Sequence, residues 1–504
     1  MLILTIYLLP AVESIEPNGQ SITHKGVPSK RCRVNVSRSA LKVFISDFGS
    51  NILGFILLIF LTRTLDAGVL GSFFLFQALL GLLAIPVDFG IRSAVTKRMS
   101  EGESASDLVS TAILLKLLPL IAISGLLLLF RHRVSEYLGA SLVSLLILAL
   151  FLQEAAKFSL NVIKGELRVG DIAIPSFAQQ STFVGLAVIF VFLDFGVSGV
   201  VYALIAGYVS MLIWGVHRMS IVPGNWSWSA ARSLWDYAKY ASVSMVSGFL
   251  YNWMDLAIIG LFLSQADVSI YEVSWRLTTI VMLLGQAMAV SVFPKVSQLD
   301  AGGNNDRIED LIPKAISPVI FLVIPAFFGT LLLSQDMLGV VFGQEYSAGW
   351  LVLVILMGEK VIQTIHVIIG RALQGIDKPR LAANSSVIAI ILNVVLNLIF
   401  VWWFGLIGAA IATLLSFTVN TALHAYYLSK FVRITLPFRE IFWAIVASFV
   451  MAAGLLVMNT VIKIDSIVTL SGFIIMGILL YGIVAYSISP LRGVVNDIIT
   501  QMKN

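Results

Sequence analysis

Long apolar runs separated by short polar breaks fill the chain from Leu41 onward. The first run, residues 41–62, has about the 20 residues that a helix needs to cross the hydrocarbon core of a bilayer. A polar elbow at residues 63–66 leads to a second run at 67–88, where Asp88, Gly90 and Arg92 are taken to mark the exit from the membrane. A spanning segment satisfies its own backbone hydrogen bonds, so each run is predicted to be a helix.

This pattern recurs along the chain and predicts about fourteen transmembrane helices. The fold class that follows is an all-α polytopic membrane protein. The predicted spans are 41–62, 67–88, 108–130, 141–164, 171–193, 197–217, 237–263, 267–293, 311–333, 350–374, 381–403, 406–428, 438–462 and 467–488.

Composition supports the membrane assignment and removes several function classes. Of 504 residues, 58% are hydrophobic and 12% charged, against roughly 45–50% and 25% in soluble domains. The net charge of +5 is spread over the loops, so no nucleic-acid partner is expected. A single cysteine, Cys32, excludes an intrachain disulfide and a cysteine-based metal cluster. The chain has no GxxxxGK[ST] motif, which argues against ATP hydrolysis.

Loop charge predicts the orientation of the chain in the membrane. If the N-terminus is cytoplasmic, about 25 basic residues fall in the cytoplasmic loops and tails, by the positive-inside rule. The opposite side then holds only Arg63, Arg131, Arg133 and Lys463. Both termini are therefore predicted to be cytoplasmic. Residues 1–40, with their Pro, Gly, Ser and basic residues, have the composition of a flexible cytoplasmic tail.

An internal repeat predicts two related bundles. The segment FGVSGVVYA at residues 195–203 matches FGLIGAAIA at 404–412, which places six helices in each copy. Copies that enter from the same side are related by a pseudo-twofold along the membrane normal and enclose a central cavity. The predicted division is a first bundle at 41–219, a linker at 220–236, a second bundle at 237–430, and helices 13 and 14 with the C-terminal tail at 431–504.

Polar side chains at helical spacing inside the spans are the candidate functional residues. Glu272 and Arg276 stand four apart, a spacing that predicts an ion pair. Asp255 lies at a similar depth in the preceding helix, so it is expected to face Arg276. Two interpretations stay open for Asp255 and Arg276: a static clasp between helices, or an ion-binding carboxylate beside a substrate-binding cation.

Similar polar stripes occur in other predicted helices. With the repeat offset, Glu154 corresponds to Gln363 and Lys157 to His366, as expected if both copies line one cavity. Asn393, Asn397, Asn420 and His424 are interpreted instead as interhelical hydrogen-bonding residues. The candidate substrate-cavity residues are Arg276, Lys116, Lys157, His366, Lys360, Asn51, Tyr251 and Asn252; the candidate ion-coupling residues are Asp255, Glu272, Asp47, Glu154 and Glu359, with H⁺ or Na⁺ as the coupling ion and no metal site.

No predicted outer loop is long enough for a catalytic domain, which favours transport over an enzyme. Three functions remain to be weighed. They are a flippase for a lipid-linked glycan, a cation-coupled exporter of small organic cations, and a membrane-bound glycan polymerase or ligase. The candidate acids and bases nearly balance in number, so charge alone does not separate the two transporters.

Several motifs carry a family resemblance over about residues 41–428. They are SDFG at 46–49, LTRTL at 61–65, VLGSF at 69–73, VDFGI at 87–91 and ALQGIDKP at 372–379. Together they resemble the polysaccharide-transporter family, the lipid-linked oligosaccharide and O-antigen flippases of the multidrug/oligosaccharidyl-lipid/polysaccharide exporter superfamily. The chain departs from the family at Asp66-Ala67-Gly68, where a Gly-Pro-Glu-type turn is common.

The resemblance implies two six-helix bundles plus two helices, a cationic cavity and alternating access. It implies a substrate in which an oligosaccharide is linked to a polyprenyl phosphate or diphosphate. It also implies a prokaryotic cell membrane, no cofactor, and glycan-assembly membrane proteins as possible partners of a monomer.

Overall fold

The computed structural model describes residues 36–503; of the side chains in this range, it leaves out those of 36–38, 243–244, 247–249, 251–252, 284 and 497–503. The described chain is α-helical and contains no strand. The predicted flexible tail at residues 1–40 lies almost wholly outside this range. By contacts the chain divides into two compact units, whose described parts are residues 36–269 and residues 270–503.

The first unit contains ten helices in the described range. They are α3 (Val36–Thr64), α4 (Ala67–Asp88), α5 (Ile91–Ser100), α6 (Ala105–Leu129), α7 (Arg131–Leu138), α8 (Val143–Gly165), η1 (Val169–Ile172), α9 (Ala173–Phe192), α10 (Gly196–Arg218) and α11 (Trp228–Phe262), followed by the start of α12 (Gln265–Thr279).

The second unit begins inside α12. It continues with α13 (Met282–Ala301), α14 (Asn305–Phe342), η2 (Gln344–Gly349), α15 (Trp350–Gly375), α16 (Pro379–Leu428), α17 (Phe438–Val461), α18 (Ile467–Ser487) and α19 (Ser489–Lys503).

Eleven helices in the described range are long and apolar enough to cross a membrane. The α16 helix covers two predicted spans, 381–403 and 406–428, with a non-helical Gly405 (φ 58°, ψ −137°) between them. The remaining predicted spans fall in α11 and in α12–α13. Every predicted span therefore corresponds to helical structure, although the count of fourteen crossings stays a prediction.

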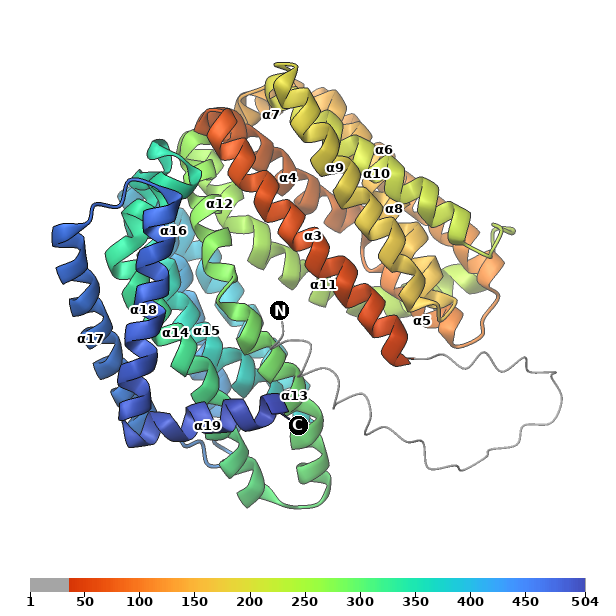
Figure 1. Ribbon diagram of the computed structural model, residues 1–504. Coiled ribbons are helices and arrows are strands. Elements are labelled where there is room, and N and C mark those ends of the chain that lie inside the picture. The colour runs from red at the N-terminus through yellow and green to blue at the C-terminus, as the bar shows by residue number, and fades with distance from the viewer. Residues whose placement is uncertain (1–35, 504) are drawn as a thin grey trace. The chain divides into compact units, whose positions relative to one another are not determined.

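Helix α4 is the centre of the first unit. It is apolar all round, as expected of a helix surrounded by others, and 61% of the residues in its most apolar window are buried, against 17% in α3 and 22% in α6. It packs against α6, α8, α10 and α11. Helices α3, α9, α10 and α8 lie side by side (Figure 1), with α3 and α9 the least buried of the four. Their exposed apolar side chains suit contact with lipid.

The end of α4 differs from the predicted exit from the membrane. Phe89 (φ 40°) and Gly90 (φ 82°) form a left-handed turn, after which the chain continues as the short helix α5. A β-carbon at Gly90 would lie 2.7 Å from the carbonyl oxygen of Ala238 in α11, so only glycine fits there. The packing of α11 over this turn keeps Asp88 and Arg92 inside the protein, at 1% and 9% exposure.

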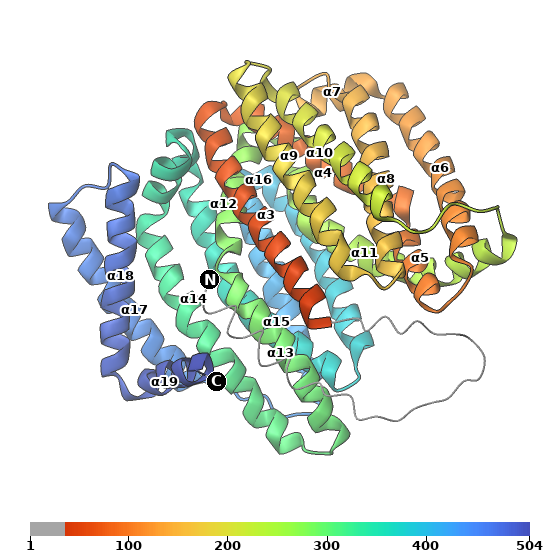
Figure 2. The same ribbon diagram turned by 45° about the vertical axis from the view of Figure 1, so that its right-hand side comes forward.

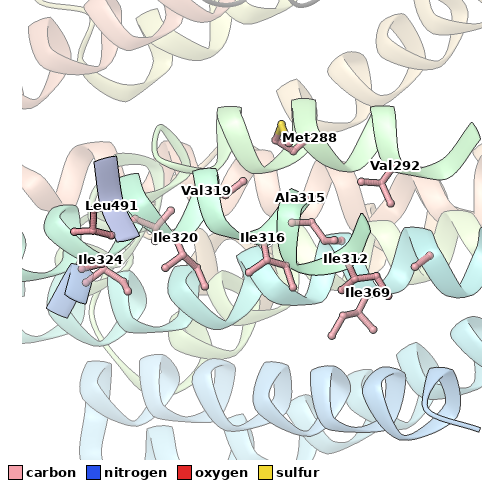
Figure 3. Close-up of a cluster of buried hydrophobic side chains, with 14 of the residues drawn as sticks. Met288, Val292, Ile312, Ala315, Ile316, Val319, Ile320, Ile324, Ile369 and Leu491 are labelled. Atoms are coloured by element: carbon pink, nitrogen blue, oxygen red, sulfur yellow. The ribbon is translucent and has the colours of Figure 1, made fainter. Parts of the chain in front are cut away.

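The second unit is built on the 38-residue helix α14, which contains Pro313, Pro318 and Pro325. Isoleucine, valine and alanine side chains of α14 pack against α13 and α15, and Leu491 of α19 joins the same core cluster (Figure 3). Helices α17 and α18 pack against each other and against α14, and α19 crosses their ends (Figure 2). The sequence predicted this added pair but not α19.

One predicted span, 267–293, is wrong as a continuous helix. It breaks at Ile280 and Val281 into α12 and α13. The hydroxyl groups of Thr278 and Thr279 donate to the carbonyl oxygens of Trp275 and Arg276, at 2.7 Å each. Neither glycine nor proline lies at the break, so the sequence there carries no helix-breaking signal.

Candidate functional site

Four charged side chains meet inside the first unit, where α4, α5, α6 and α8 come together. The ammonium of Lys116 on α6 lies 3.0 Å from Asp88 Oδ1 on α4 and 2.6 Å from Glu154 Oε2 on α8. Both carboxylates are almost completely buried, at 1% and 3% exposure. Buried charges are tolerated only when they are paired, so Lys116 holds three helices together at this point.

The fourth member, Arg92, comes from the first turn of α5. Its Nε lies 2.8 Å from Asp88 Oδ1, and its Nη2 lies 3.8 Å from Glu154 Oε1. The backbone N–H of Arg92 also donates to Asp88 Oδ1 at 3.3 Å. Asp88 therefore stabilises the N-terminus of α5 as a helix-capping carboxylate does. We call Asp88, Arg92, Lys116 and Glu154 the four-charge cluster.

Lys157 lies one turn beyond Glu154 on α8 and is half-buried. Among the described residues, no carboxylate comes within 4.0 Å of its ammonium. Beside it, Gln153 accepts a hydrogen bond of 2.9 Å from the hydroxyl of Tyr208 on α10. Counted with Lys157, the cluster has three cations and two carboxylates, so this part of the first unit carries an excess positive charge.

A crevice of about 460 Å³ adjoins the four-charge cluster. Its walls are apolar side chains of α6, α8 and α10, and Met219, Ile221, Val222 and Pro223 also line it. Lys116 and Glu154 are the charged side chains that line it. The crevice is thus apolar over most of its surface and polar where it reaches the cluster.

The second unit holds its charges differently. Arg276 Nε lies 2.5 Å from Glu272 Oε1, which confirms the predicted pair at i,i+4 within α12. Lys360 and Glu359 are neighbours on α15, with 2.7 Å between Nζ and Oε2, and both are fully buried. The Lys360 ammonium also lies 5.7 Å from the centre of the Trp275 ring, a distance suited to a cation–π contact.

Two histidines meet between α15 and α16. The rings of His366 and His424 are 4.6 Å apart and nearly perpendicular. Nδ1 of His424 lies 2.9 Å from the carbonyl oxygen of Asn420, so this nitrogen carries a proton that it donates. His366 also contacts the ring of Phe417, at 5.7 Å between centroids. His424, predicted to be a structural hydrogen-bonding residue, is therefore the partner of a predicted cavity residue.

Comparison with known proteins decides the family. Residues 60–350, more than half of the chain, match the family model described as "Polysaccharide biosynthesis protein". The chain belongs to this family. It is 44% identical, over 91% of its own length and 97% of the relative's, to the "Probable low-salt glycan biosynthesis flippase Agl15" of Haloferax volcanii. It is 30% identical, over 88% and 94%, to the "Probable flippase AglR" of the same organism.

Solved structures show that this polysaccharide-family chain has the fold of known transporters. A structure of the lipid II flippase MurJ in an inward closed conformation superposes with a TM-score of 0.75, at 15% identity, over 88% of this chain and 98% of that one. An inward-facing multidrug resistance MATE family transporter of the MOP superfamily gives 0.60 at 17% identity, over 78% and 97%. The family member is a multi-pass membrane protein of this fold.

The structure brings together some of the predicted site residues of this family member. Lys116 and Glu154 pair directly, with Lys157 nearby, and Glu359 pairs with Lys360. Asp47 and Asn51 on α3 are exposed. Asp255 is buried in α11. Because it lies in the first unit and Arg276 in the second, their pairing stays a prediction. The side chains of Tyr251 and Asn252 lie outside the described residues.

Sequence reasoning missed Asp88 and Arg92 as members of a site, since the end of an apolar run was taken for the membrane surface. A signal was present. The two residues are opposite charges four apart with Gly90 between them, and in the structure this glycine forms the turn that lets Asp88 both end one helix and cap the next.

Proposed function

We propose that this chain moves a lipid-linked oligosaccharide, carried on polyprenyl phosphate or diphosphate, from the cytoplasmic to the outer leaflet by alternating access. Family membership and the names of its relatives support this assignment. Those relatives are named as flippases rather than enzymes, which disfavours a glycan polymerase or ligase. In this reading the chain has no cofactor and catalyses no bond cleavage.

The observation that carries the proposal is the excess positive charge of the four-charge cluster and Lys157 taken together, which is three cations against two carboxylates. Phosphate and diphosphate groups are anions, and they bind where cations are held partly out of water. Lys157 is the cation best suited to this role. It is half-buried and free of a carboxylate partner within salt-bridge distance among the described residues. Arg92 and Lys116, held by Asp88 and Glu154, then support the positive potential around it.

Further substrate-binding residues are proposed in both units. They are Arg276, Lys360 and His366 in the second unit and Asn51, Tyr251 and Asn252 in the first. Transport against a gradient needs a coupled ion, and the buried carboxylates are the groups that bind H⁺ or Na⁺. We assign this role to Asp255, Glu272, Glu154 and Glu359, with Asp47 as an exposed acid on α3.

The membrane arrangement in this proposal follows the charge of the loops. Both termini are cytoplasmic, the chain lies in the cell membrane of a prokaryote and acts as a monomer, and membrane proteins of glycan assembly are its expected partners. The repeat at 195–203 and 404–412 supports bundles at 41–219 and 237–430, joined by 220–236 and followed by 431–504. Contacts in the structure instead group α11 with α4, α5 and α6. The boundary between the compact units therefore falls after α11, whereas the boundary predicted from the repeat falls before residue 237.

The test is a transport assay with the full chain in proteoliposomes. A fluorescent polyprenyl-diphosphate oligosaccharide is placed in the membrane, and its exposure to an impermeant glycosidase is followed over time. Lys157→Gln should slow translocation by about 10- to 100-fold, because a charge-assisted hydrogen bond contributes roughly 1.5–3 kcal/mol. Lys463→Gln, at an exposed lysine between α17 and α18, is the matched control and should transport at the wild-type rate.

Disruption of the chromosomal gene gives the second measurement. A lipid-linked oligosaccharide should accumulate on the cytoplasmic leaflet and be restored to the outer leaflet by the intact gene. No accumulation, together with a gained sensitivity to cationic dyes, would contradict the proposal and favour an exporter of organic cations.

A further inference from the structure

The crevice beside the four-charge cluster has features that translocation of a lipid head group alone does not require. Among its lining side chains, Ile113, Phe151 and Val216 are apolar and exposed, at 39%, 47% and 55%. They belong to helices whose exposed apolar faces suit contact with the bilayer. The crevice is therefore continuous with the proposed lipid-facing surface of the first unit.

Part of the crevice is lined by the segment that connects α10 to α11. This segment is fixed by hydrogen bonds rather than by apolar packing alone. Ser106 donates to the carbonyl oxygen of Val222 at 2.8 Å, and the N–H of Gly224 donates back to the carbonyl oxygen of Ser106 at 3.1 Å. The N–H of Ser220 donates to Glu166 at 2.8 Å. By the orientation proposed above, this segment lies on the cytoplasmic side.

At its inner wall the crevice meets Lys116 and Glu154. A lysine ammonium has three N–H donors, and the Lys116 ammonium has two carboxylate partners. The four-charge cluster behind this wall is balanced, and Lys157 next to it adds one positive charge. A molecule that fits both parts has a hydrocarbon chain for the walls and an anionic group at the inner end.

Apolar packing by itself does not select such a molecule. Inside a bilayer the acyl chains are as apolar as the crevice, so burial adds little driving force. Selection must come from shape and from the charged inner wall. A cavity of about 460 Å³ lies within the range of 300–1,000 Å³ typical of small-molecule sites, and it is too small for a long polyprenyl chain as a whole.

We propose that this crevice holds the part of the substrate's isoprenoid tail that lies nearest the phosphate groups. The proposal rests on the proposed function, because the tail belongs to the lipid-linked substrate. The head group is then guided toward the four-charge cluster and Lys157, while the remainder of the tail stays in the bilayer. The crevice acts as a lateral recognition site on the first unit, built from α6, α8 and α10.

The experiment uses the full chain in nanodiscs and a geranylgeranyl diphosphate that carries a photoreactive diazirine on its hydrocarbon chain. After irradiation, labelled peptides are identified by mass spectrometry. Labels are expected on residues 109–120 of α6 and 151–159 of α8. Ala155→Phe fills the crevice and should lower labelling of these peptides by about tenfold or more, the change that corresponds to roughly 1.4 kcal/mol of binding free energy.

The matched control is Ala122→Phe, the same substitution at an exposed position of α6 that does not line the crevice. In the Ala122→Phe variant, the crevice peptides should be labelled to the same extent as in the wild type. Ala155→Leu adds less volume and should give an intermediate loss, which keeps the test valid if the phenylalanine variant fails to fold.

Two results would overturn the inference. One is unchanged labelling of the crevice peptides in a folded Ala155 variant. The other is equal competition by excess phosphatidylglycerol and by unlabelled geranylgeranyl diphosphate, which would mean that the crevice holds ordinary bilayer lipid. If labelling fails these tests while Lys157→Gln still slows translocation, only the tail site is wrong. If the wild-type chain does not translocate the glycan at all, the proposed function itself falls.

Discussion

The buried ion pairs described in the two units differ in whether they connect separate helices. In the first unit one ammonium, that of Lys116, joins carboxylates from two other helices, and Arg92 adds a fourth side chain from α5. In the second unit two ion pairs among the described residues lie within single helices, Glu272 with Arg276 on α12 and Glu359 with Lys360 on α15. Charges in the first unit therefore tie helices to one another, whereas these pairs in the second unit move with their own helix.

This difference has a mechanical consequence. A helix that slides or tilts in the first unit would pull apart an ion pair buried in low dielectric, at a cost of several kcal/mol. Each of the two pairs in the second unit survives a rigid movement of its helix. The contrast predicts that the four-charge cluster keeps α4, α5, α6 and α8 together as one body during transport.

The largest effect is expected for Lys116→Met. The substitution leaves Asp88 and Glu154 buried with only Arg92 to pair them, and removal of one partner of a buried ion pair costs about 3–5 kcal/mol. The measurement is thermal unfolding in detergent, followed by size-exclusion chromatography of the surviving folded protein, together with abundance in the membrane.

A combined variant distinguishes lost charge pairing from lost packing at Lys116. Asp88→Asn and Glu154→Gln, added to Lys116→Met, remove the unpaired charges and should recover much of the stability, since uncharged replacements of a buried network are often tolerated. If Lys116→Met alone unfolds no more easily than the wild type, the cluster does not tie the helices together and the contrast between the units is lost.

A smaller loss is expected for Gly90→Ala, which tests the turn that places Asp88 and Arg92. The new β-carbon would meet the carbonyl oxygen of Ala238 and the N–H of Ser242, at 2.7 and 2.9 Å, in a left-handed backbone. Strain of this kind costs about 1–3 kcal/mol. Gly102→Ala is the matched control, because Gly102 has a similar φ of +89° and open space around it. Equal losses of stability in the two variants would show that the close approach of α11 is unimportant.

How much of the site was predictable depends on the separation of its residues along the chain. The pair of Glu272 and Arg276 follows from spacing on one helix, and the bounds of α4 follow from the apolar run at 67–88. The partners of Lys116 could not be predicted, because they are 28 and 38 residues away. Only the packing of three helices decides which polar side chains meet.

Two features were predicted wrongly: the position of Asp88 and Arg92 at the membrane surface, and the continuity of the helix at 267–293. Asp88 and Arg92 end an apolar run, and such residues ordinarily face water at the membrane surface. Here α11 covers them, a tertiary contact that hydropathy does not contain. The break between α12 and α13 was missed because residues 278–281 contain neither glycine nor proline.

The smallest effect on stability is expected for Arg276→Met in the second unit. The Arg276 side chain is 34% exposed and that of Glu272 is 4% exposed. The substitution therefore leaves one buried carboxylate without its cation, where Lys116→Met leaves two, and water that reaches Arg276 partly screens the pair. If Arg276 binds the substrate's phosphate, translocation should fall about tenfold or more, while the unfolding temperature falls less than it does for Lys116→Met. Arg276→Lys keeps the charge without the planar fork and should recover part of the activity.

A loss of stability as large as that of Lys116→Met would mean that Arg276 also connects helices, as Lys116 does in the first unit. The ratio of the two changes in unfolding temperature, measured under the same conditions, therefore shows whether Arg276 holds helices together or leaves them free to move.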